Sequence, residues 1–95
     1  MITSKIICNR IKYLRVKRNY NQHFISIKLG LGSTKSYARI ENNESELNIN
    51  TLLKVCVILR IPLLVLLDED YDLDAYLAAE FFELPPSKKI KFKLQ

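Results

Sequence analysis

The chain has 95 residues, 48% of them hydrophobic, and a formal net charge of +5. This length suits a single domain, and this apolar content supports a compact core without disulfide bridges. Both cysteines, Cys8 and Cys56, lie inside apolar helical patterns, so we expect a reduced protein of the cytoplasm. The apolar run over residues 55–67 contains Arg60 and Pro62 and is shorter than the roughly 20 residues of a transmembrane helix, so we expect no membrane segment.

The charge is distributed unevenly along the chain. Residues 1–67 carry 11 Lys and Arg against 3 Glu, residues 68–84 carry 7 acids and no Lys or Arg, and residues 85–95 carry 4 Lys. A basic segment suits a polyanionic partner, although a solvated basic surface explains the same count equally well. Charge alone therefore does not decide what the basic part binds.

Helical spacing of apolar residues predicts the first two elements. The first helix spans residues 4–18, with an apolar stripe facing inward and Lys and Arg facing outward. The stripe consists of Ile7, Ile11 and Leu14. The second helix begins after Asn21, a predicted N-cap, and stops at Gly30, a residue that tolerates positive φ.

A third, short helix follows this turn. Ser33 is its predicted N-cap, and Tyr37 and Ile40 point inward. The outward positions carry hydrogen-bonding side chains without an apolar role: Thr34, Lys35, Ser36 and Arg39. Two short helices joined by a glycine turn are typical of a helix-turn-helix motif.

Two further helices complete the amino-terminal part. Asn48 caps the fourth helix, and Pro62 lies in the first turn of the fifth. The apolar stripe of the fourth helix consists of Leu52, Val55, Cys56 and Leu59. No alternating stretch appears before residue 88, so we expect an all-α bundle with short connections.

The order and content of these elements resemble the Xre-type, phage-repressor-like helix-turn-helix DNA-binding family. The resemblance covers residues 4–67 and rests on five segments in the family's order. They are Arg-Ile-Lys-Tyr-Leu-Arg at 10–15, Asn-Gln at 21–22, Arg-Ile-Glu-Asn-Asn at 39–43, and the apolar segments at 51–59 and 61–67. The resemblance implies a five-helix repressor-like bundle over residues 1–67 that binds double-stranded DNA and needs no cofactor.

The resemblance also assigns base-reading residues. The family reads bases from the first two turns of the third helix, which here carry Thr34, Lys35 and Arg39. Arg39 is the strongest candidate because a guanidinium bonds O6 and N7 of guanine together, whereas Lys35 can equally contact a phosphate. Ser36 is a secondary candidate, and an exposed polar residue without a contact is its alternative.

Phosphate contacts are expected at both ends of the motif. The candidates are Asn21, Gln22, Asn42 and Asn43. In the family, Gln at the amino end of the second helix contacts a phosphate, and a solvent-facing Gln22 is the alternative. For Asn21, capping alone is a sufficient explanation.

Arg15 and Glu41 match family positions that form an internal ion pair between the first helix and the end of the third. Such a pair would fix the third helix on the scaffold, and breaking a partly buried pair from one side costs roughly 3–5 kcal/mol. The alternative is two unconnected surface charges, which contribute little to stability.

The sequence departs from the family pattern at both ends of the third helix. Residues 30–32, Gly-Leu-Gly, make the preceding turn one residue longer than usual, and we expect Gly32 to absorb the extra residue. Asn42 and Asn43 stand where the family often has Gly, and Asn tolerates the left-handed conformation that such a turn needs. Glu44 and Glu46 occupy positions that hold basic residues in many relatives, so we expect one monomer to bind phosphates weakly.

Residues 68–84 form an acidic turn and an additional helix. Asp72 is its predicted cap, and its apolar stripe consists of Leu73, Leu77, Phe81 and Leu84. With Leu64 and Val65 of the fifth helix, Leu73, Leu77 and Phe81 are predicted to build a two-fold dimer interface. The alternative is that the sixth helix covers the fifth within one subunit.

Residues 85–95 form a basic tail with three alternative roles. Ile90, Phe92 and Leu94 alternate with Lys, which suits a strand added to a partner. Disorder is the alternative that we favour, and a basic tail beside the DNA backbone is the third.

Metal binding and enzymatic chemistry find no support in the sequence. The acids at 68, 70, 72 and 74 fail the calcium-loop spacing, because Leu73 and Ala79 stand where that loop requires Gly and Glu. His23 is the one histidine, and no paired nucleophile and base or phosphate-binding loop accompanies it.

The sequence favours a dimeric transcriptional regulator that binds an operator with two half-sites. The alternative is an antitoxin that binds a toxin through residues 68–95 and its own promoter through the helix-turn-helix. The two differ in the carboxyl-terminal segment, which is folded in the free regulator and orders only on its partner in the antitoxin.

Overall fold

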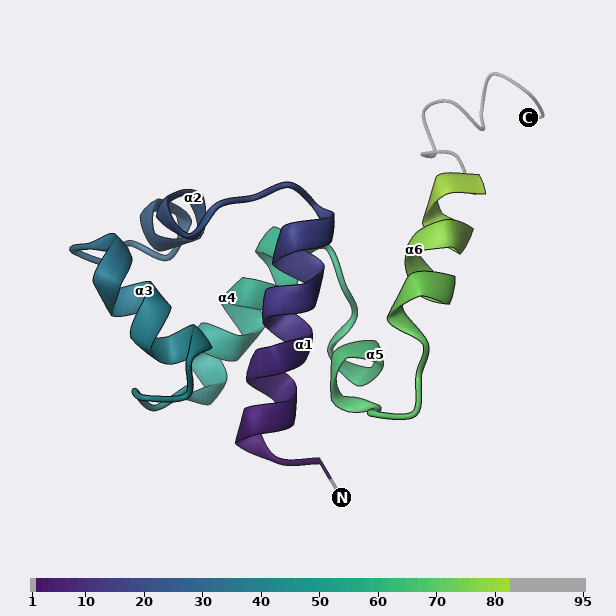
Figure 1. The fold of residues 1–95 in the computed structure, drawn as a ribbon, viewed down its shortest axis with the longest axis horizontal. Helices are drawn as coiled ribbons and strands as arrows, with labels where there is room; N and C mark the ends of the chain where they lie inside the picture. Colours follow the sequence, from purple (N-terminus) through teal and green to yellow (C-terminus); the bar gives the residue numbers. More distant parts are fainter. Residues whose placement is uncertain (1, 83–95) are drawn as a thin grey trace.

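The computed structural model describes residues 2–82, with side chains up to residue 80, and folds this part into six helices and no strand (Figure 1). The helices are α1 (Ser4–Lys17), α2 (Gln22–Lys28), α3 (Thr34–Glu41), α4 (Ile49–Leu59), α5 (Leu63–Leu67) and α6 (Leu73–Phe82). Helix α1 runs through the middle of the molecule, with α2 and α3 on one side and α5 and α6 on the other. Between residues 2 and 82, none of these helices has both the length and the apolar character for crossing a membrane.

The predicted caps begin the helices where the sequence expects them. Asn21 Oδ1 accepts from Phe24 N at 2.8 Å, Ser33 Oγ from Ser36 N at 3.2 Å, and Asn48 Oδ1 from Thr51 N at 2.9 Å. Asp72 Oδ1 likewise accepts from Asp74 N and Ala75 N at the start of α6. Pro62 differs slightly from the prediction, because it precedes α5 as its N-cap residue.

Four helices end on a residue in the left-handed conformation. These residues are Asn19, Gly30, Asn43 and Arg60. In each case the backbone N–H of this residue and that of the next residue donate to carbonyls of the last helical turn, as in the Schellman motif. Asn43, with φ of 62°, therefore closes α3 in the conformation that the sequence led us to expect.

The turn between α2 and α3 confirms the prediction that the second helix stops at Gly30. The left-handed residue is Gly30, with φ of +74°, whereas Gly32 has no positive φ and no atom within 4 Å of where a Cβ would lie. The carboxyl end of α2 fixes this choice, because Gly30 N donates to Ile27 O and Leu31 N donates to Ser26 O. Gly32 therefore lies in a turn that other residues can form.

The core lies where α1, α2, α3, α4 and α5 meet. Its buried side chains are Ile11, Leu14, Ile25, Tyr37, Leu52, Val55, Cys56, Leu59, Ile61, Leu66 and Leu73. Most residues of the predicted apolar stripes belong to this cluster. Ile40 is half-buried. The inclusion of Leu73 shows that α6 shares the core of the preceding five helices.

Helix α6 corrects part of the predicted dimer interface. Leu73 is only 6% exposed and packs in the core of its own subunit, so its side chain is not available to a second copy. Leu77 is half-buried and packs against the same core. The side chain of Phe81, and all of Leu84 and residues 85–95, lie outside the described part of the structure.

Candidate nucleic-acid interface

Three of the four predicted base-reading side chains are exposed on α3. Lys35, Ser36 and Arg39 are exposed and Thr34 is half-buried, while Tyr37 on the opposite side of the helix is buried in the core. A helix with one face in the core and a polar, cationic face outside can enter a major groove. The structure thus brings the four side chains to one helix, with Thr34, Lys35 and Ser36 in its first turn and Arg39 in its last.

Two of these side chains already have polar partners. Ser36 Oγ lies 3.0 Å from Ser33 Oγ at the cap of α3. Thr34 Oγ1 lies 3.0 Å from Nδ1 of His23, which is exposed on α2. Sequence reasoning missed His23 as a neighbour of α3, because this distance depends on the turn that brings α2 and α3 together.

The predicted phosphate-contacting residues lie in two groups. Asn21 and Gln22 lie at the start of α2, and Asn42 and Asn43 follow the end of α3. Asn21 is used as a cap through its carbonyl oxygen, and Gln22 Nε2 donates to Glu41 Oε1 at 3.1 Å. Asn43 Oδ1 accepts from Ser4 Oγ at 2.9 Å, which ties the loop after α3 to the start of α1.

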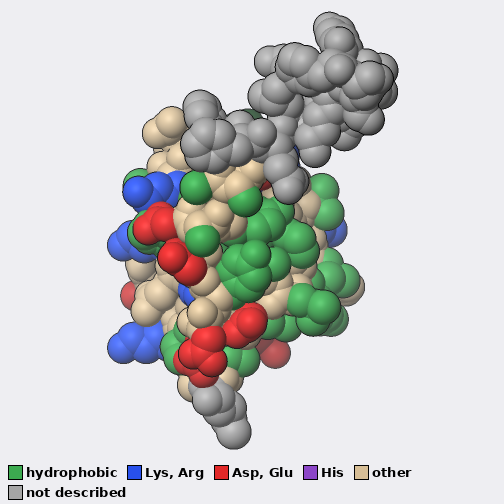
Figure 2. Space-filling view, turned by 90° about the vertical axis from the view of Figure 1, so that its right-hand side faces the viewer, with side chains coloured by type: hydrophobic (Ala, Val, Ile, Leu, Met, Phe, Trp, Pro, Cys, Tyr) green, Lys and Arg blue, Asp and Glu red, His purple; other side chains and the backbone are tan. Residues whose placement is uncertain are grey.

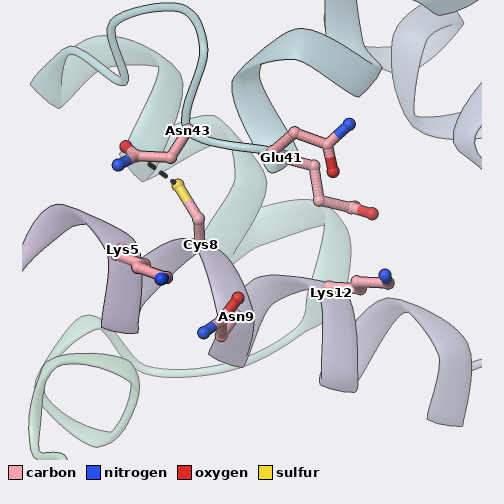
Figure 3. A pocket seen from close by; sticks show the side chains of 7 residues that line it. Lys5, Cys8, Asn9, Lys12, Glu41 and Asn43 are labelled. Atoms are coloured by element: carbon pink, nitrogen blue, oxygen red, sulfur yellow. Dashed lines mark hydrogen bonds between the residues drawn. The ribbon is translucent and has the colours of Figure 1, made fainter.

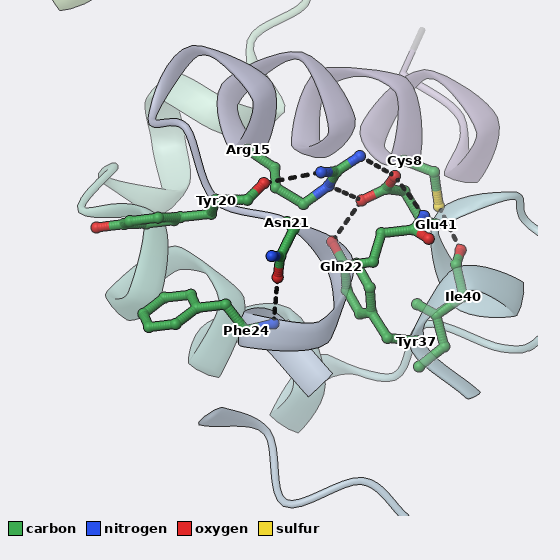
Figure 4. Close-up of polar contacts among 9 residues, drawn as sticks. All are labelled: Cys8, Arg15, Tyr20, Asn21, Gln22, Phe24, Tyr37, Ile40 and Glu41. Carbon is green, nitrogen blue, oxygen red and sulfur yellow. Dashed lines mark hydrogen bonds and ion pairs between the residues drawn. The ribbon is translucent and has the colours of Figure 1, made fainter. Parts of the chain in front are cut away.

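Arg15 and Glu41 form an ion pair with two parallel hydrogen bonds (Figure 4). Arg15 Nε lies 2.8 Å from Glu41 Oε2, and Arg15 Nη2 lies 3.0 Å from Glu41 Oε1. Arg15 Nη1 also donates to Tyr20 O at 2.8 Å. The guanidinium therefore joins α1, the connection before α2 and the last residue of α3.

The Glu41 carboxylate collects two further donors. Tyr37 Oη donates to Oε2 at 2.7 Å, and Gln22 Nε2 donates to Oε1. We call the four residues Arg15, Gln22, Tyr37 and Glu41 the brace. Both ends of the helix-turn-helix are thereby attached to one buried carboxylate.

Electrostatics keeps this carboxylate charged. Burial alone would raise the pKa of Glu41, but hydrogen bonds from Arg15, Tyr37 and Gln22 outweigh burial and lower it. Burial, together with the hydrogen bond to Glu41, raises the pKa of Tyr37, so its hydroxyl remains a donor. The brace is therefore one anion held by one cation and two neutral donors.

Arg10 of α1 and Arg18, the C-cap of α1, do not belong to the solvated basic face that the sequence suggested. Arg10 donates to the carbonyls of Val65 and Leu66, at 2.8 Å each, and Arg18 donates to the carbonyl of Leu59 at 2.9 Å. These arginines are directed at the ends of α4 and α5. The exposed positive charges of α1 are those of its lysines.

The comparisons with known proteins agree with this geometry. A profile of the helix-turn-helix family matches residues 11–66, which is more than half of the chain. The comparisons with curated proteins and with solved structures gave no match. The matched segment contains all of α2, α3 and α4 and the four residues of the brace. The chain therefore belongs to the Xre-like helix-turn-helix family and carries its DNA-binding domain.

Proposed function

We propose that this protein is a cytoplasmic, sequence-specific transcriptional regulator that binds a two-half-site operator in double-stranded DNA as a dimer. The observation that carries the proposal is the braced reading helix: α3 is fixed at its carboxyl end by Glu41 and presents Lys35 and Arg39 to solvent. A rigid helix with exposed cationic donors suits base recognition, because direct readout requires side chains held in a fixed register.

Arg39 is the main base-reading residue in this proposal. It is exposed in the last turn of the eight-residue α3, whereas Thr34, Lys35 and Ser36 lie in the first turn. Arg39 offers paired donors to guanine, Lys35 offers a single cationic donor, and Thr34 offers a methyl group because its hydroxyl has a partner in His23.

The phosphate contacts proposed for Asn21, Gln22, Asn42 and Asn43 flank this helix. Asn42 is exposed, and the side-chain amides of Asn21, Gln22 and Asn43 each keep an N–H group that their hydrogen bonds do not use. Phosphate contacts at both ends would set the position of α3 in the groove without reading sequence.

An apolar surface beside α4 and α5 supports dimerisation. A groove of about 500 Å³ is lined by Leu53 and Val57 of α4, Leu63 of α5 and Tyr76 of α6, among others. Leu64 and Val57 are 80% and 77% exposed. Figure 2 shows a broad area of hydrophobic side chains on the face where α5 and α6 lie. We therefore place the dimer interface at Leu53, Val57 and Leu64, with Val65 and Leu77 at its edge.

The antitoxin alternative receives less support. It predicts that residues 68–95 order only on a toxin, yet α6 already forms a helix with Leu73 in the core. Arg18, which follows α1 as its C-cap, also forms an ion pair with Glu80 of α6. A carboxyl-terminal helix that packs on its own subunit favours the regulator.

Operator selection with wild type and Arg39→Ala tests the proposal. Wild type should enrich a two-fold symmetric site from random duplexes. Arg39→Ala should bind that site more weakly by about 1–3 kcal/mol and lose preference at one base pair, because a bidentate base contact carries that discrimination.

Lys54→Ala is the matched control, because Lys54 is exposed on α4 and its loss removes the same charge. It should retain the full base preference. If Arg39→Ala selects the same site with the same preference as the control, Arg39 does not read a base.

A further inference from the structure

A pocket lies beside the reading helix that the predicted contact residues only partly include. It has a volume of about 310 Å³ and lies between α1 and the loop that follows α3 (Figure 3). Lys5, Cys8, Asn9 and Lys12 line it from α1, and Glu41, Asn42 and Asn43 line it from the other side. Two of the predicted phosphate-contacting residues therefore share a hollow with two lysines.

The pocket is cationic in spite of Glu41. The side chain of Glu41 is fully buried, and its charge is neutralised within the brace by Arg15. Lys5 and Lys12 are exposed, and within residues 2–82 neither ammonium group has a carboxylate partner. Asn9 and Asn42, both exposed, add neutral amide donors at the rim.

The remaining groups that line the pocket carry no charge that would repel an anion. Cys8 Sγ donates to Ile40 O at 3.3 Å, and burial raises the pKa of the Cys8 thiol, so it stays neutral. The carbonyls at the end of α3 are paired: Ile40 O also accepts from Asn43 N, and Arg39 O accepts from Glu44 N. These hydrogen bonds partly offset the partial negative charge at the carboxyl end of α3.

We propose that this pocket holds a phosphate of the duplex backbone, with Lys5 and Lys12 as its cationic ligands and Asn9 and Asn42 as neutral donors. The proposal rests on the proposed function and extends its contacts to α1. The pocket adjoins the end of the helix that would lie in the major groove, where backbone phosphates border that groove.

The proposal also accounts for the acids after α3. Glu44 and Glu46 are exposed where phosphate-binding cations are expected, and they cannot neutralise a phosphate. Lys5 and Lys12 bring positive charge to the same end of α3 from a different helix. The positive charge that this loop lacks is thus supplied by α1.

The test compares two variants with the same change in net charge. Lys5→Gln/Lys12→Gln removes the cations of the pocket. Lys17→Gln/Lys54→Gln removes two exposed cations elsewhere, one over the Tyr13 ring of α1 and one on α4. Plots of log K against log salt for the selected operator should show a slope smaller by about one for the pocket variant only.

A scan with single methylphosphonate linkages identifies the phosphate. One position in each half-site should weaken wild-type binding and have no further effect on the pocket variant. Lys5→Arg/Lys12→Arg, which keeps the charge, should retain the wild-type slope. Inorganic phosphate at constant ionic strength should not compete with the operator.

Several results would overturn the inference. Equal slopes for the two Gln variants, or additive effects of the variant and every neutral linkage, would show that the pocket holds no backbone phosphate. Selective displacement of wild type by inorganic phosphate would make it a site for a free anion instead. A wild type that selects no duplex would overturn the proposed function itself, and the inference with it.

Discussion

At the scale of single residues, the Glu41 carboxylate determines how firmly the reading helix is held. Its two oxygens accept from two nitrogens of Arg15, from Tyr37 and from Gln22. The side chain of Arg15 is 11% exposed, so removal of Glu41 would leave a mostly buried cation without its counter-charge. This loss outweighs that of a surface ion pair, which contributes at most about 1 kcal/mol.

Glu41→Ala should therefore lower the free energy of unfolding by about 3–5 kcal/mol and weaken operator binding at the same time. Arg15→Ala/Glu41→Ala should cost less than the sum of the single changes, because the double variant leaves no buried charge without its partner. Urea unfolding followed by circular dichroism gives the three values, and additive costs would mean that the two residues are not coupled.

The brace also has a defined pH dependence. The folded-state pKa of Glu41 lies below its ordinary value of 4.5, so the charged carboxylate stabilises the fold above that pH. This stabilisation is lost as the pH falls through the lower, folded-state pKa. The difference in unfolding free energy between wild type and Glu41→Gln should be constant near neutral pH and shrink below about pH 4.5.

Sequence reasoning proposed the Arg15–Glu41 pair but not the other two members of the brace. Helical periodicity assigned Tyr37 to the core, and the resemblance assigned Gln22 to a phosphate. Both assignments describe which way a side chain points. They leave open which polar atom its end meets, because that depends on how α1, α2 and α3 are packed together.

At the scale of helices, the sequence pattern predicted the features that depend on neighbouring residues. Spacing and caps placed α1 to α4 nearly to the residue, because both signals lie within a few residues of the helix they define. The stop of the second helix at Gly30 was predictable in the same way. The burial of Leu73 was not, because it depends on contacts with a distant part of the chain.

Leu73 and Glu80 are two of the residues that attach α6, and their expected contributions differ. Leu73 is buried, so Leu73→Ala should cost about 2–5 kcal/mol. Glu80 is 39% exposed, and Arg18 keeps its bonds to main-chain carbonyls without it, so Glu80→Gln should cost less than about 1 kcal/mol. Truncation after Leu67 removes Leu73 from the core and should therefore destabilise the bundle.

Hydrogen exchange and thermal unfolding test whether Leu73 contributes more than Glu80 to the attachment of α6. Glu80→Gln should speed exchange in residues 73–82 with little change in melting temperature. Asp70→Asn is the control, since it removes one acidic charge from the exposed loop before α6. A larger loss of stability from Glu80→Gln than from Leu73→Ala would show that the ion pair, and not the core contact, attaches α6.

At the scale of the whole molecule, the proposed function gives one subunit a single reading helix, the eight-residue α3. Two copies joined through Leu53, Val57 and Leu64 would bind two half-sites together, with centres about 34–36 Å apart along the duplex. Val57→Asp/Leu64→Asp should shift dimer to monomer and reduce operator affinity, because it places charges in an apolar interface.

Sedimentation and gel-shift experiments check this prediction. Val16→Asp/Ile27→Asp is the control, because Val16 and Ile27 are also exposed apolar residues but lie on α1 and α2. The control should remain dimeric. If the interface variant sediments and binds as wild type does, the apolar area around α4 and α5 serves another partner.

The main-chain bonds of Arg10 and Arg18 have a consequence for how this protein can diverge. Every residue type presents the same carbonyl oxygen, so these arginines hold the ends of α4 and α5 whatever side chains stand on the outer surface there. Substitutions at that surface can accumulate while the operator-reading helix stays unchanged. Duplicated copies of such a regulator could thus stop pairing with one another and still recognise the same DNA.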